Sequence, residues 1–439
     1  MNLNNSARIS FALLTLFSSA GLMAAPVDDV KSLAQAGRAA EAYALGKQHP
    51  EAMGDPAFDF FFGIASIDSG HAGDGVLALE RYVLIFPDNN SARLQLARGY
   101  FALGEDSRAR EEFEELRKLS LPPDEAATLD RFLDAIRLRE TRYTPSSGAY
   151  IEAGFGSDSN VNSGVSDPSI SLPNLGPVIV GPAGVKKGAT FSHLGAGGYL
   201  SYPVLPGVSL YANGSAEQKL NNGDTAFDQG NYSGSAGVSV LNEKELFRFG
   251  LTHSLTYIAN TRFRASTGVS GEWQHQLDQY QSFVLGLQTG RYSYPGANSA
   301  RDANYLGLTG GYRKLFNHAW QPILSANVSL GREDTIAQGR QDLARQYAGG
   351  RLGVSFTPAA KWGVAIGYSV QSSRYQAQDA FFGVTRKDDY DAVDAAVTYL
   401  INRNLSLRAE ALLSKNRANI DLLSFRRDIF ALKLRYEFK

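Results

Sequence analysis

Histidine, cysteine and paired carboxylates are the residues whose spacing most often reveals catalytic or metal chemistry. The chain has no cysteine and six histidines: His49, His71, His193, His253, His275 and His318. Two lie in a helical half of the chain, two fall on strand faces that look apolar, and two flank strand ends. None has a Ser/Asp or Asp/Asp constellation beside it, and spacings typical of metal sites are missing. We therefore expect a protein that is not an enzyme and that uses no cofactor.

Composition and charge narrow the remaining classes of protein. The 439 residues carry a formal net charge of -1, so no basic surface indicates nucleic acid as a partner. The 44 glycines, 24 phenylalanines and 21 tyrosines suit closely packed, aromatic-girdled strands better than helices. The length allows two or three domains.

The first 25 residues have the pattern of a secretory signal peptide. Arg8 supplies the positive charge, residues 9–17 form a short apolar core, and small residues around Ala24 and Ala25 offer a cleavage site. The apolar run is far shorter than the ~20 residues of a spanning helix. No later stretch approaches that length, so a position in a membrane would require a closed barrel.

Residues 26–142 show the three- and four-residue apolar spacing of helices. Two similar units place small residues at Gly63 and Gly75 and again at Ala97 and Ala109. The offset of ~34 residues is that of a tetratricopeptide repeat, in which small residues let two helices approach closely. We expect a periplasmic, tetratricopeptide-like domain.

Helical repeats of this kind present a concave face to peptides or partner domains. Arg93, Arg98 and Tyr100 belong to one expected helix, and we predict that they contact the partner that this face binds. The alternatives are a solvated outer face for these residues and a spacer role for the whole domain.

The pattern changes near residues 143–148, where proline and glycine interrupt it and the period falls to two. Residues 143–439 contain about fourteen strand-like segments, separated alternately by short turns and by mostly longer polar loops. This alternation is typical of an outer-membrane barrel with periplasmic turns and external loops. The fold class predicted is therefore α + β multidomain, with N-terminal helical repeats and a transmembrane antiparallel β-barrel.

Individual strands separate an apolar face from a polar one. One segment is expected to direct apolar side chains outward from Trp362, Val364, Ile366, Tyr368 and Val370. Charged residues fall on the opposite faces of other strands, and we expect them to point into the barrel: Arg248, Arg262, Arg264, Glu272, Arg408 and Glu410.

The last strand alternates Leu432, Leu434, Tyr436 and Phe438, as strands read by the barrel-assembly machinery do. Lys439 follows the terminal aromatic residue, and Lys433 stands where such strands often have glycine.

The order of signal peptide, short helical-repeat domain and barrel resembles the surface lipoprotein assembly modifier (Slam) family. The resemblance is sharpest where residues 150–156 lead into Asp158-Ser159-Asn160-Val161-Asn162, and it extends to the closing strand. It implies an outer-membrane translocon that moves client proteins, either surface lipoproteins or secreted haem- or iron-binding proteins, to the cell surface.

The same resemblance implies a barrel in the outer membrane and a helical domain in the periplasm. The expected partners are the client, outer-membrane lipid with lipopolysaccharide, and the barrel-assembly machinery. Phe381 and Phe382, near the tip of an outer loop, are predicted to contact the emerging client; packing within their own loop is the simpler alternative. A porin-like or polysaccharide-export channel with a helical adaptor remains the alternative function.

Overall fold

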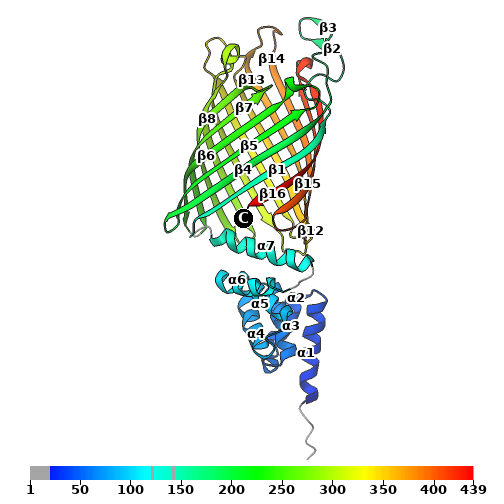
Figure 1. The fold of residues 1–439 in the computed structure, drawn as a ribbon, viewed down its shortest axis with the longest axis vertical. Coiled ribbons are helices and arrows are strands. Elements are labelled where there is room, and N and C mark those ends of the chain that lie inside the picture. The colour runs from blue at the N-terminus through cyan, green and yellow to red at the C-terminus, as the bar shows by residue number, and fades with distance from the viewer. Residues whose placement is uncertain (1–19, 120–122, 141–143, 243, 439) are drawn as a thin grey trace, which may run out of the picture. The chain divides into compact units, whose positions relative to one another are not determined.

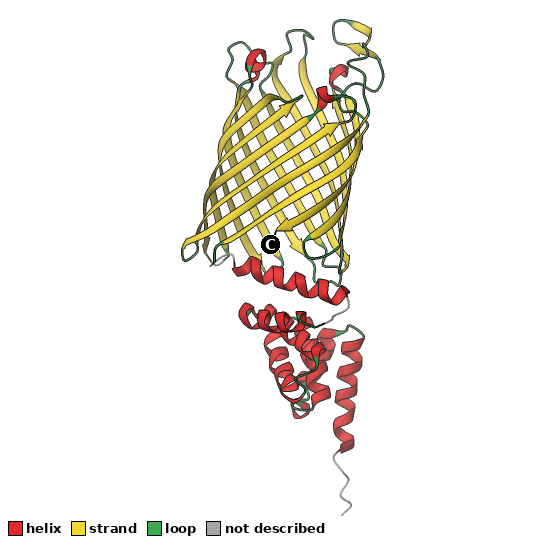
Figure 2. Ribbon diagram, viewed as in Figure 1, coloured by secondary structure: helices red, strands yellow, loops and turns green. Residues whose placement is uncertain are grey.

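The computed structural model describes residues 20–119, 123–140, 144–242 and 244–438, which form two compact units (Figure 1). The first unit is helical and the second is a β-barrel (Figure 2). The predicted signal peptide lies largely outside the described residues. Among those described, no helix combines the length and apolar character needed to span a membrane.

The helical unit is built from short helices that pack against their neighbours in the chain. Its elements are α1 (Ala20–Gln35), α2 (Ala39–Lys47), the 3₁₀ turn η1 (Pro50–Ala52), α3 (Pro56–Asp68), α4 (Ala72–Ile85), α5 (Asn90–Leu103), α6 (Asp106–Arg117) and residues 129–136 of α7 (Pro123–Glu140). Apolar residues on one face of each helix form the core, and the largest fully buried ones are Phe58, Phe62, Leu79, Phe113, Leu116, Leu129 and Ile136.

Small residues set the separation between paired helices, as the sequence predicts. A Cβ atom on Gly63 of α3 would lie 2.6 Å from Leu79 Cγ on α4, and one on Gly75 would lie 2.7 Å from the Gly63 carbonyl. At the equivalent positions of the next pair, Ala97 and Ala109 are fully buried. Any larger side chain at Gly63 or Gly75 would force these helices apart.

The ends of α3 and α5 repeat the same local chemistry. The Asp55 side chain accepts a hydrogen bond from the Phe58 amide at 3.0 Å, and Asn89 accepts one from the Ala92 amide at 3.1 Å. Each caps the first turn of its helix. The chain leaves the two helices through Gly70 and Gly104, with φ of 88° and 80°. The N-terminal caps and the glycines that follow the C-terminal ends thus recur at the ~34-residue spacing of the two sequence units.

Fourteen antiparallel strands close the barrel, which confirms the predicted number and fold class. The barrel strands are β1 (Ser146–Asp158), β4 (Ala189–Leu205), β5 (Val208–Asn221), β6 (Gln229–Asn242), β7 (Glu245–Ile258), β8 (Thr261–Asp278), β9 (Gln281–Ser293), β10 (Ala303–Leu315), β11 (Ile323–Thr335), β12 (Arg345–Ala359), β13 (Trp362–Gln378), β14 (Thr385–Leu400), β15 (Leu405–Ala418) and β16 (Phe425–Phe438). Each barrel strand pairs with the next barrel strand along the chain, so that β1 pairs with β4. The barrel is closed by β1 and β16, which pair from Ala149↔Phe438 to Asp158↔Ile429.

Turns and loops alternate between the two ends of the barrel, with one difference from the prediction. The β10–β11 connection spans residues 316–322 and is therefore longer than the short turn expected at that end of the barrel. On the loop side, the second short connection is β7–β8, which needs only residues 259–260, in keeping with the expectation that only most of these loops are long. That second turn is tight because Ala259 and Asn260 both adopt positive φ, as a two-residue hairpin turn requires. The longest loop, 159–188, contains the small hairpin of β2 (Ser169–Leu172) and β3 (Gly176–Ile179).

Cross-strand registers separate the inner and outer faces as predicted. Trp362, Ile366 and Tyr368 of β13 lie on the outer face and are between 44% and 48% exposed. Leu434, Tyr436 and Phe438 of β16 share that face. The outer surface is therefore an apolar belt, and the inner surface is polar.

Candidate functional site

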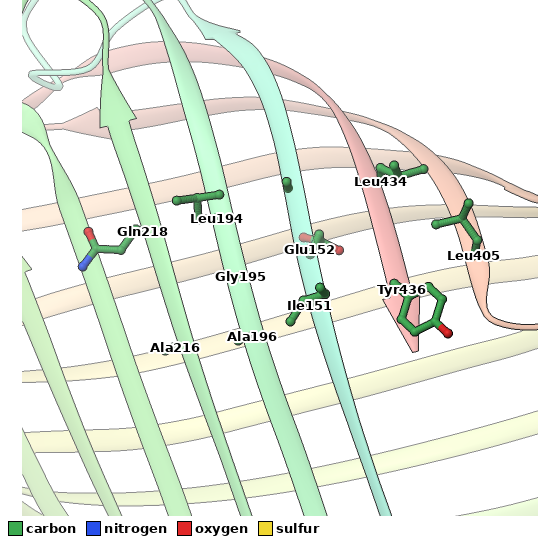
Figure 3. A pocket seen from close by; sticks show the side chains of 11 residues that line it. Ile151, Glu152, Leu194, Gly195, Ala196, Ala216, Gln218, Leu405, Leu434 and Tyr436 are labelled. Carbon is green, nitrogen blue, oxygen red and sulfur yellow. The ribbon is translucent and has the colours of Figure 1, made fainter. Parts of the chain in front are cut away.

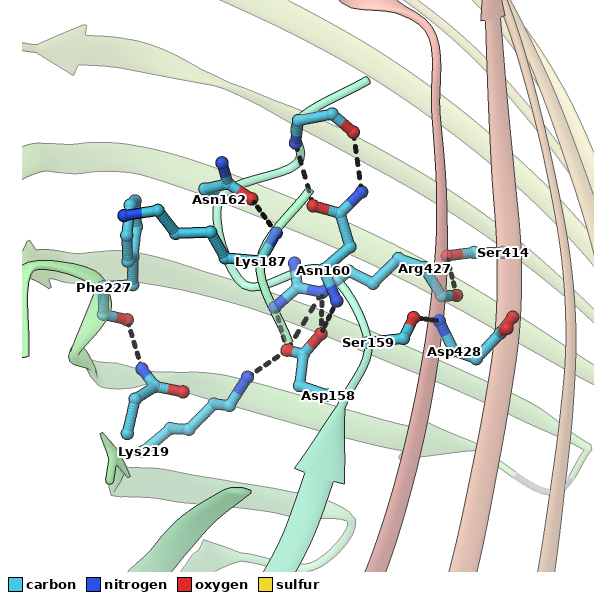
Figure 4. A network of polar contacts seen from close by, with 12 residues as sticks. Asp158, Ser159, Asn160, Asn162, Lys187, Lys219, Phe227, Ser414, Arg427 and Asp428 are labelled. Atoms are coloured by element: carbon cyan, nitrogen blue, oxygen red, sulfur yellow. Dashed lines mark hydrogen bonds and ion pairs between the residues drawn. The ribbon is translucent and has the colours of Figure 1, made fainter. Parts of the chain in front are cut away.

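The inner rim of the β1–β16 junction holds a buried ionic network (Figure 4). Asp158, the last residue of β1, is 1% exposed. Arg427 of β16 contacts it through Nη2 at 2.6 Å and through Nε at 3.1 Å, and Lys219 of β5 contacts the same carboxylate. One carboxylate thus links three strands, and the two cations compensate the cost of burying it.

The Asp-Ser-Asn-Val-Asn segment folds the start of the long loop. Asn160 is fully buried; its side chain accepts from the Gly164 amide at 2.8 Å and donates to the Gly164 and Arg426 carbonyls. Asn162 donates to the Val185 carbonyl at 2.8 Å and accepts from the Lys187 amide. The side-chain amides of Asn160 and Asn162 thus hold the two ends of the long loop against each other and against β16.

A second network crosses the junction on the inner face. Glu152 of β1 lies 2.9 Å from His193 Nε2 of β4 and 3.5 Å from Lys433 Nζ of β16. Lys433 also contacts Glu410 of β15 at 2.9 Å, and Arg408 contacts Glu410 at 2.7 Å. Polar contacts therefore bridge four consecutive strands across the closure of the barrel, and charges of opposite sign alternate from β1 to β15.

Lys433 also explains why the last strand departs from the usual terminal pattern. Its backbone pairs with Gly154 of β1, and a Cβ atom on Gly154 would lie 2.8 Å from Lys433 Cγ. The glycine on β1 leaves room for the lysine stem on β16, which lets the ammonium group reach both carboxylates. The usual terminal pattern has glycine on the last strand, whereas here the glycine, Gly154, lies on β1 and Lys433 lies opposite it on β16.

The outer face of the same junction carries an apolar groove of about 480 Å³. Leu194, Ile151, Leu434, Tyr436 and Leu405 project along it from four strands (Figure 3). Ala153, Ala196 and Ala216 leave its floor open because their side chains are short. The junction is therefore apolar outside and ionic inside, as a strand pair between lipid and water should be.

The remaining predicted inward charges are mostly confirmed. Arg248 and Glu272 are inner-face partners on β7 and β8 and form an ion pair at 3.1 Å. Arg264 lies over the Tyr292 ring at 4.8 Å. Arg262 differs, because a register shift pairs it with Tyr257, which faces outward. The strict alternation read from the sequence does not hold through that irregularity.

The histidines divide as the sequence suggests, with one exception. His253 and His275 lie on the outer face and contact Thr267 and Glu245 there. His193 is the exception: it lies within β4 rather than at a strand end and is 8% exposed beside Glu152. No group of three His, Asp or Glu side chains able to hold a metal ion occurs in the described ranges.

The three predicted client-contacting residues of the helical unit point in different directions. Arg93 of α5 pairs with Glu112 of α6 at 2.7 Å, whereas Arg98 pairs with Asp68 of α3 at 2.7 Å. Tyr100 is 4% exposed and donates a hydrogen bond to Glu80. Burial and that carboxylate raise the pKa of Tyr100 well above its ordinary value. Tyr100 therefore lies in the core, and Arg98 remains the accessible member on the α3 side.

A second polar contact in the helical unit joins α2 to α4. Tyr43 donates to the Asp74 carboxylate at 2.8 Å, and Lys47 lies 3.2 Å from the same group. The Tyr43 hydrogen bond, together with Lys47, lowers the pKa of the Asp74 carboxyl. The His71 ring stacks on Tyr43 with 3.8 Å between centroids, which fixes the tyrosine in place.

Phe381 and Phe382 occupy the β13–β14 loop. Phe381 is 72% exposed, while Phe382 is partly buried and packs against it edge-on. The Phe382 carbonyl accepts a hydrogen bond from Asn174 in the long loop at 2.7 Å. The Ser171 amide likewise contacts Asp421 in the β15–β16 loop. The segment of the β2–β3 hairpin thus contacts the β13–β14 loop and the β15–β16 loop.

A closed, fourteen-stranded antiparallel barrel with an apolar outer belt and a polar interior defines an outer-membrane β-barrel. Residues 370–438, which include the last three strands, match the family model described as "Putative beta-barrel porin 2". No curated protein sequence matches the chain.

Solved barrels are similar to this chain only at low identity. An anion-selective porin from Comamonas acidovorans is 10% identical, with a TM-score of 0.36 over 67% of this chain and 99% of that one. A Pseudomonas aeruginosa FadL homologue is 11% identical, with a TM-score of 0.34 over 66% and 90% of the two chains. A bacterial polysaccharide outer membrane secretin is 9% identical, with a TM-score of 0.34 over 66% and 98%.

Proposed function

We propose that the protein is an outer-membrane translocon that moves specific client proteins to the cell surface. The observation that carries this proposal is the joining, in one chain, of a helical unit with 34-residue spacing to a fourteen-stranded barrel. Helical arrays with that spacing bind peptides and partner domains. We propose that this helical unit is tetratricopeptide-like, lies in the periplasm and receives the client. Translocation of the client in this proposal requires no enzymatic step.

The Asp158–Asn162 segment supports the same proposal. It carries the resemblance to the surface lipoprotein assembly modifier family, and its side chains anchor the long loop beside β16. We infer that this anchoring keeps the mouth of the barrel ordered while a client passes. The clients in this proposal are surface lipoproteins or secreted binding proteins.

A porin-like channel is the second candidate, and the family-model match over residues 370–438 favours it. The inner face also offers paired charges, such as Arg351 with Asp394 at 2.8 Å, that would suit a hydrated solute path. A channel of this kind would need no client-specific surface on the helical unit.

Protease shaving of whole cells separates the two candidates. Surface peptides released from a deletion strain would be compared with those from wild type by mass spectrometry. The translocon proposal predicts that one or a few proteins leave the surface and accumulate in the periplasm. An unchanged surface proteome together with slower uptake of small solutes would contradict it and support the channel.

A further inference from the structure

Charged residues of the outer face are most numerous near the external rim of β11 to β16, with Arg262 of β8 and Arg291 of β9 as further outward cations. Near the loop ends of β11 to β16, outward positions carry six basic and four acidic residues: Arg332, Arg374, Lys387, Lys415, Arg417 and Arg426, with Asp334, Asp389, Asp391 and Asp428. The equivalent outward positions of β1 and β4 to β7 carry no charge: Phe155, Ser157, Thr190, Ser192, Gln218, Leu220, Gly230, Tyr232, Leu255 and Tyr257.

The charged half follows the strand registers. Arg332 pairs with Gln346, Gln346 with Arg374, and Arg374 with Lys387, which forms one row across β11 to β14. Three strand spacings make this row roughly 14 Å long. The charges continue in the next rows of β14 to β16, and apolar residues replace them toward the middle of the barrel.

A groove of about 490 Å³ lies directly beneath the two arginines of this row. Leu306, Leu308 and Leu330 line it, and their side chains are between 38% and 55% exposed. Ala348 leaves its centre open, and Arg332 and Arg374 stand at its outer end. The site therefore combines an apolar slot with cationic groups at the end nearest the external loops.

We propose that this groove and its basic row bind the lipid A part of lipopolysaccharide, with an acyl chain in the slot and phosphate on the row. Arginine forms strong paired hydrogen bonds to phosphate, and lysine contributes a point charge. The salt bridges that Arg332 and Arg374 make with Asp334 and Asp389 are solvent-exposed, so exchanging a carboxylate for a phosphate costs little.

The position of the groove and the basic row, near the external loops, favours lipid A over other membrane lipids as the ligand. External loops mark the outer leaflet, whose characteristic lipid is a phosphorylated disaccharide with several acyl chains. The row is long enough to contact more than one anionic group of such a head group. Lys387 strengthens this complementarity, because its exposed side chain adds a third positive charge to the row beside Arg374. The uncharged half of the rim offers no such contact.

Native mass spectrometry of the full chain in detergent tests the proposal. Diphosphoryl lipid A, monophosphoryl lipid A and phosphatidylglycerol would be titrated against wild type and Arg332→Gln/Arg374→Gln. Wild type should prefer diphosphoryl lipid A, and the double variant should bind it at least about tenfold more weakly. Lys186→Gln/Lys187→Gln removes the same charge from exposed loop residues and should bind like wild type.

Three results would overturn the proposal. The first is equal binding of phosphatidylglycerol and diphosphoryl lipid A to wild type, and the second is the same loss in the control variant as in Arg332→Gln/Arg374→Gln. The third is a wild-type dimer that the arginine substitutions dissociate, which would assign the groove to a second copy of the chain. Heat-dependent gel mobility of each variant verifies that the barrel is folded before binding is compared.

Discussion

Asp158 at the end of β1 and Arg427 on β16 form an ion pair, with Nη2 2.6 Å from Oδ2, across the junction of the first and last strands. The two residues are 269 positions apart in the chain, and both are largely buried. Lys219 joins them from β5. This contact closes the barrel at the end where the longest loop begins.

Asp158→Asn should destabilise the barrel strongly. The substitution leaves Arg427 and Lys219 buried without their shared carboxylate, and such a loss costs about 3–5 kcal/mol. Thermal unfolding followed by heat-dependent gel mobility measures the effect. Asp428→Asn is the matched control, since its pair with Arg426 is exposed at 3.4 Å and should contribute at most about 1 kcal/mol. Equal melting of the two variants would contradict this role for Asp158.

The β1–β16 junction should remain closed while a client is exported. The strands pair without a register shift from Ala149 to Asp158, and opening them in lipid would leave their backbone groups unpaired. Because the chain has no native cysteine, Ala153→Cys/Leu434→Cys can place one disulfide across directly paired residues. Client display should be unchanged after oxidation.

Ala236→Cys/Leu251→Cys provides the control for that experiment, because it locks the ordinary β6–β7 pair in the same way. If oxidation stopped export only in the junction variant, and reduction restored it, the client would pass through a lateral opening rather than the lumen.

Arg98→Glu should reduce client display without changing barrel assembly. Arg98 lies on the α3 side of α5 and is partly exposed beside Asp68. The exchange Arg98→Asp/Asp68→Arg retains the ion pair between α5 and α3 but inverts its charges. It therefore separates a role of Arg98 in client binding from a role in holding the two helices together. If the exchange restored display, Arg98 would serve only to hold α3 against α5.

The α2–α4 contact should make the helical unit sensitive to acid. The pKa of Asp74 lies below its ordinary value, so its ionised form favours the folded chain. That stabilisation is present at neutral pH and is lost as the pH falls below about 4 and through the lowered pKa. Amide exchange in α3 and α4 should therefore be faster in Asp74→Asn than in wild type at pH 7.

The same comparison at pH 3 should show a smaller difference, because protonation removes much of the contribution in wild type. Asp88→Asn, at an exposed position between α4 and α5, should match wild type at both pH values. A difference that stayed constant between pH 7 and pH 3 would show that ionisation of Asp74 is not its source.

Local periodicity was sufficient to predict the strands, their faces and the close helix pairs, because each depends on neighbouring residues. Contacts across the closure could not be predicted in this way. His193 meets Glu152 only through the β1–β4 register, and the place of Lys433 in the last strand is explained only by Gly154, its partner on β1. Strict alternation predicts the wrong face for Arg262, because alternation alone cannot reveal a register shift.

The client-contact prediction shows a related limit. Helical spacing places Arg93, Arg98 and Tyr100 on one helix but does not tell which partner helix each one meets. Burial of Tyr100 follows from the packing of α4 and α6 around α5, which is a property of three helices together. Contact with a client by Arg93, Arg98, Phe381 or Phe382 stays a prediction.

Site-specific photo-crosslinking in living cells tests client export most directly. A photoreactive amino acid would replace Arg98 in the helical unit or Phe381 in the external loop, with Lys118 as an exposed control position. If the protein exports a client, the probes at positions 98 and 381 should capture the same exported protein, and the probe at position 118 should not. Capture of no common protein from the two positions would contradict passage of a client from the helical unit to the cell surface.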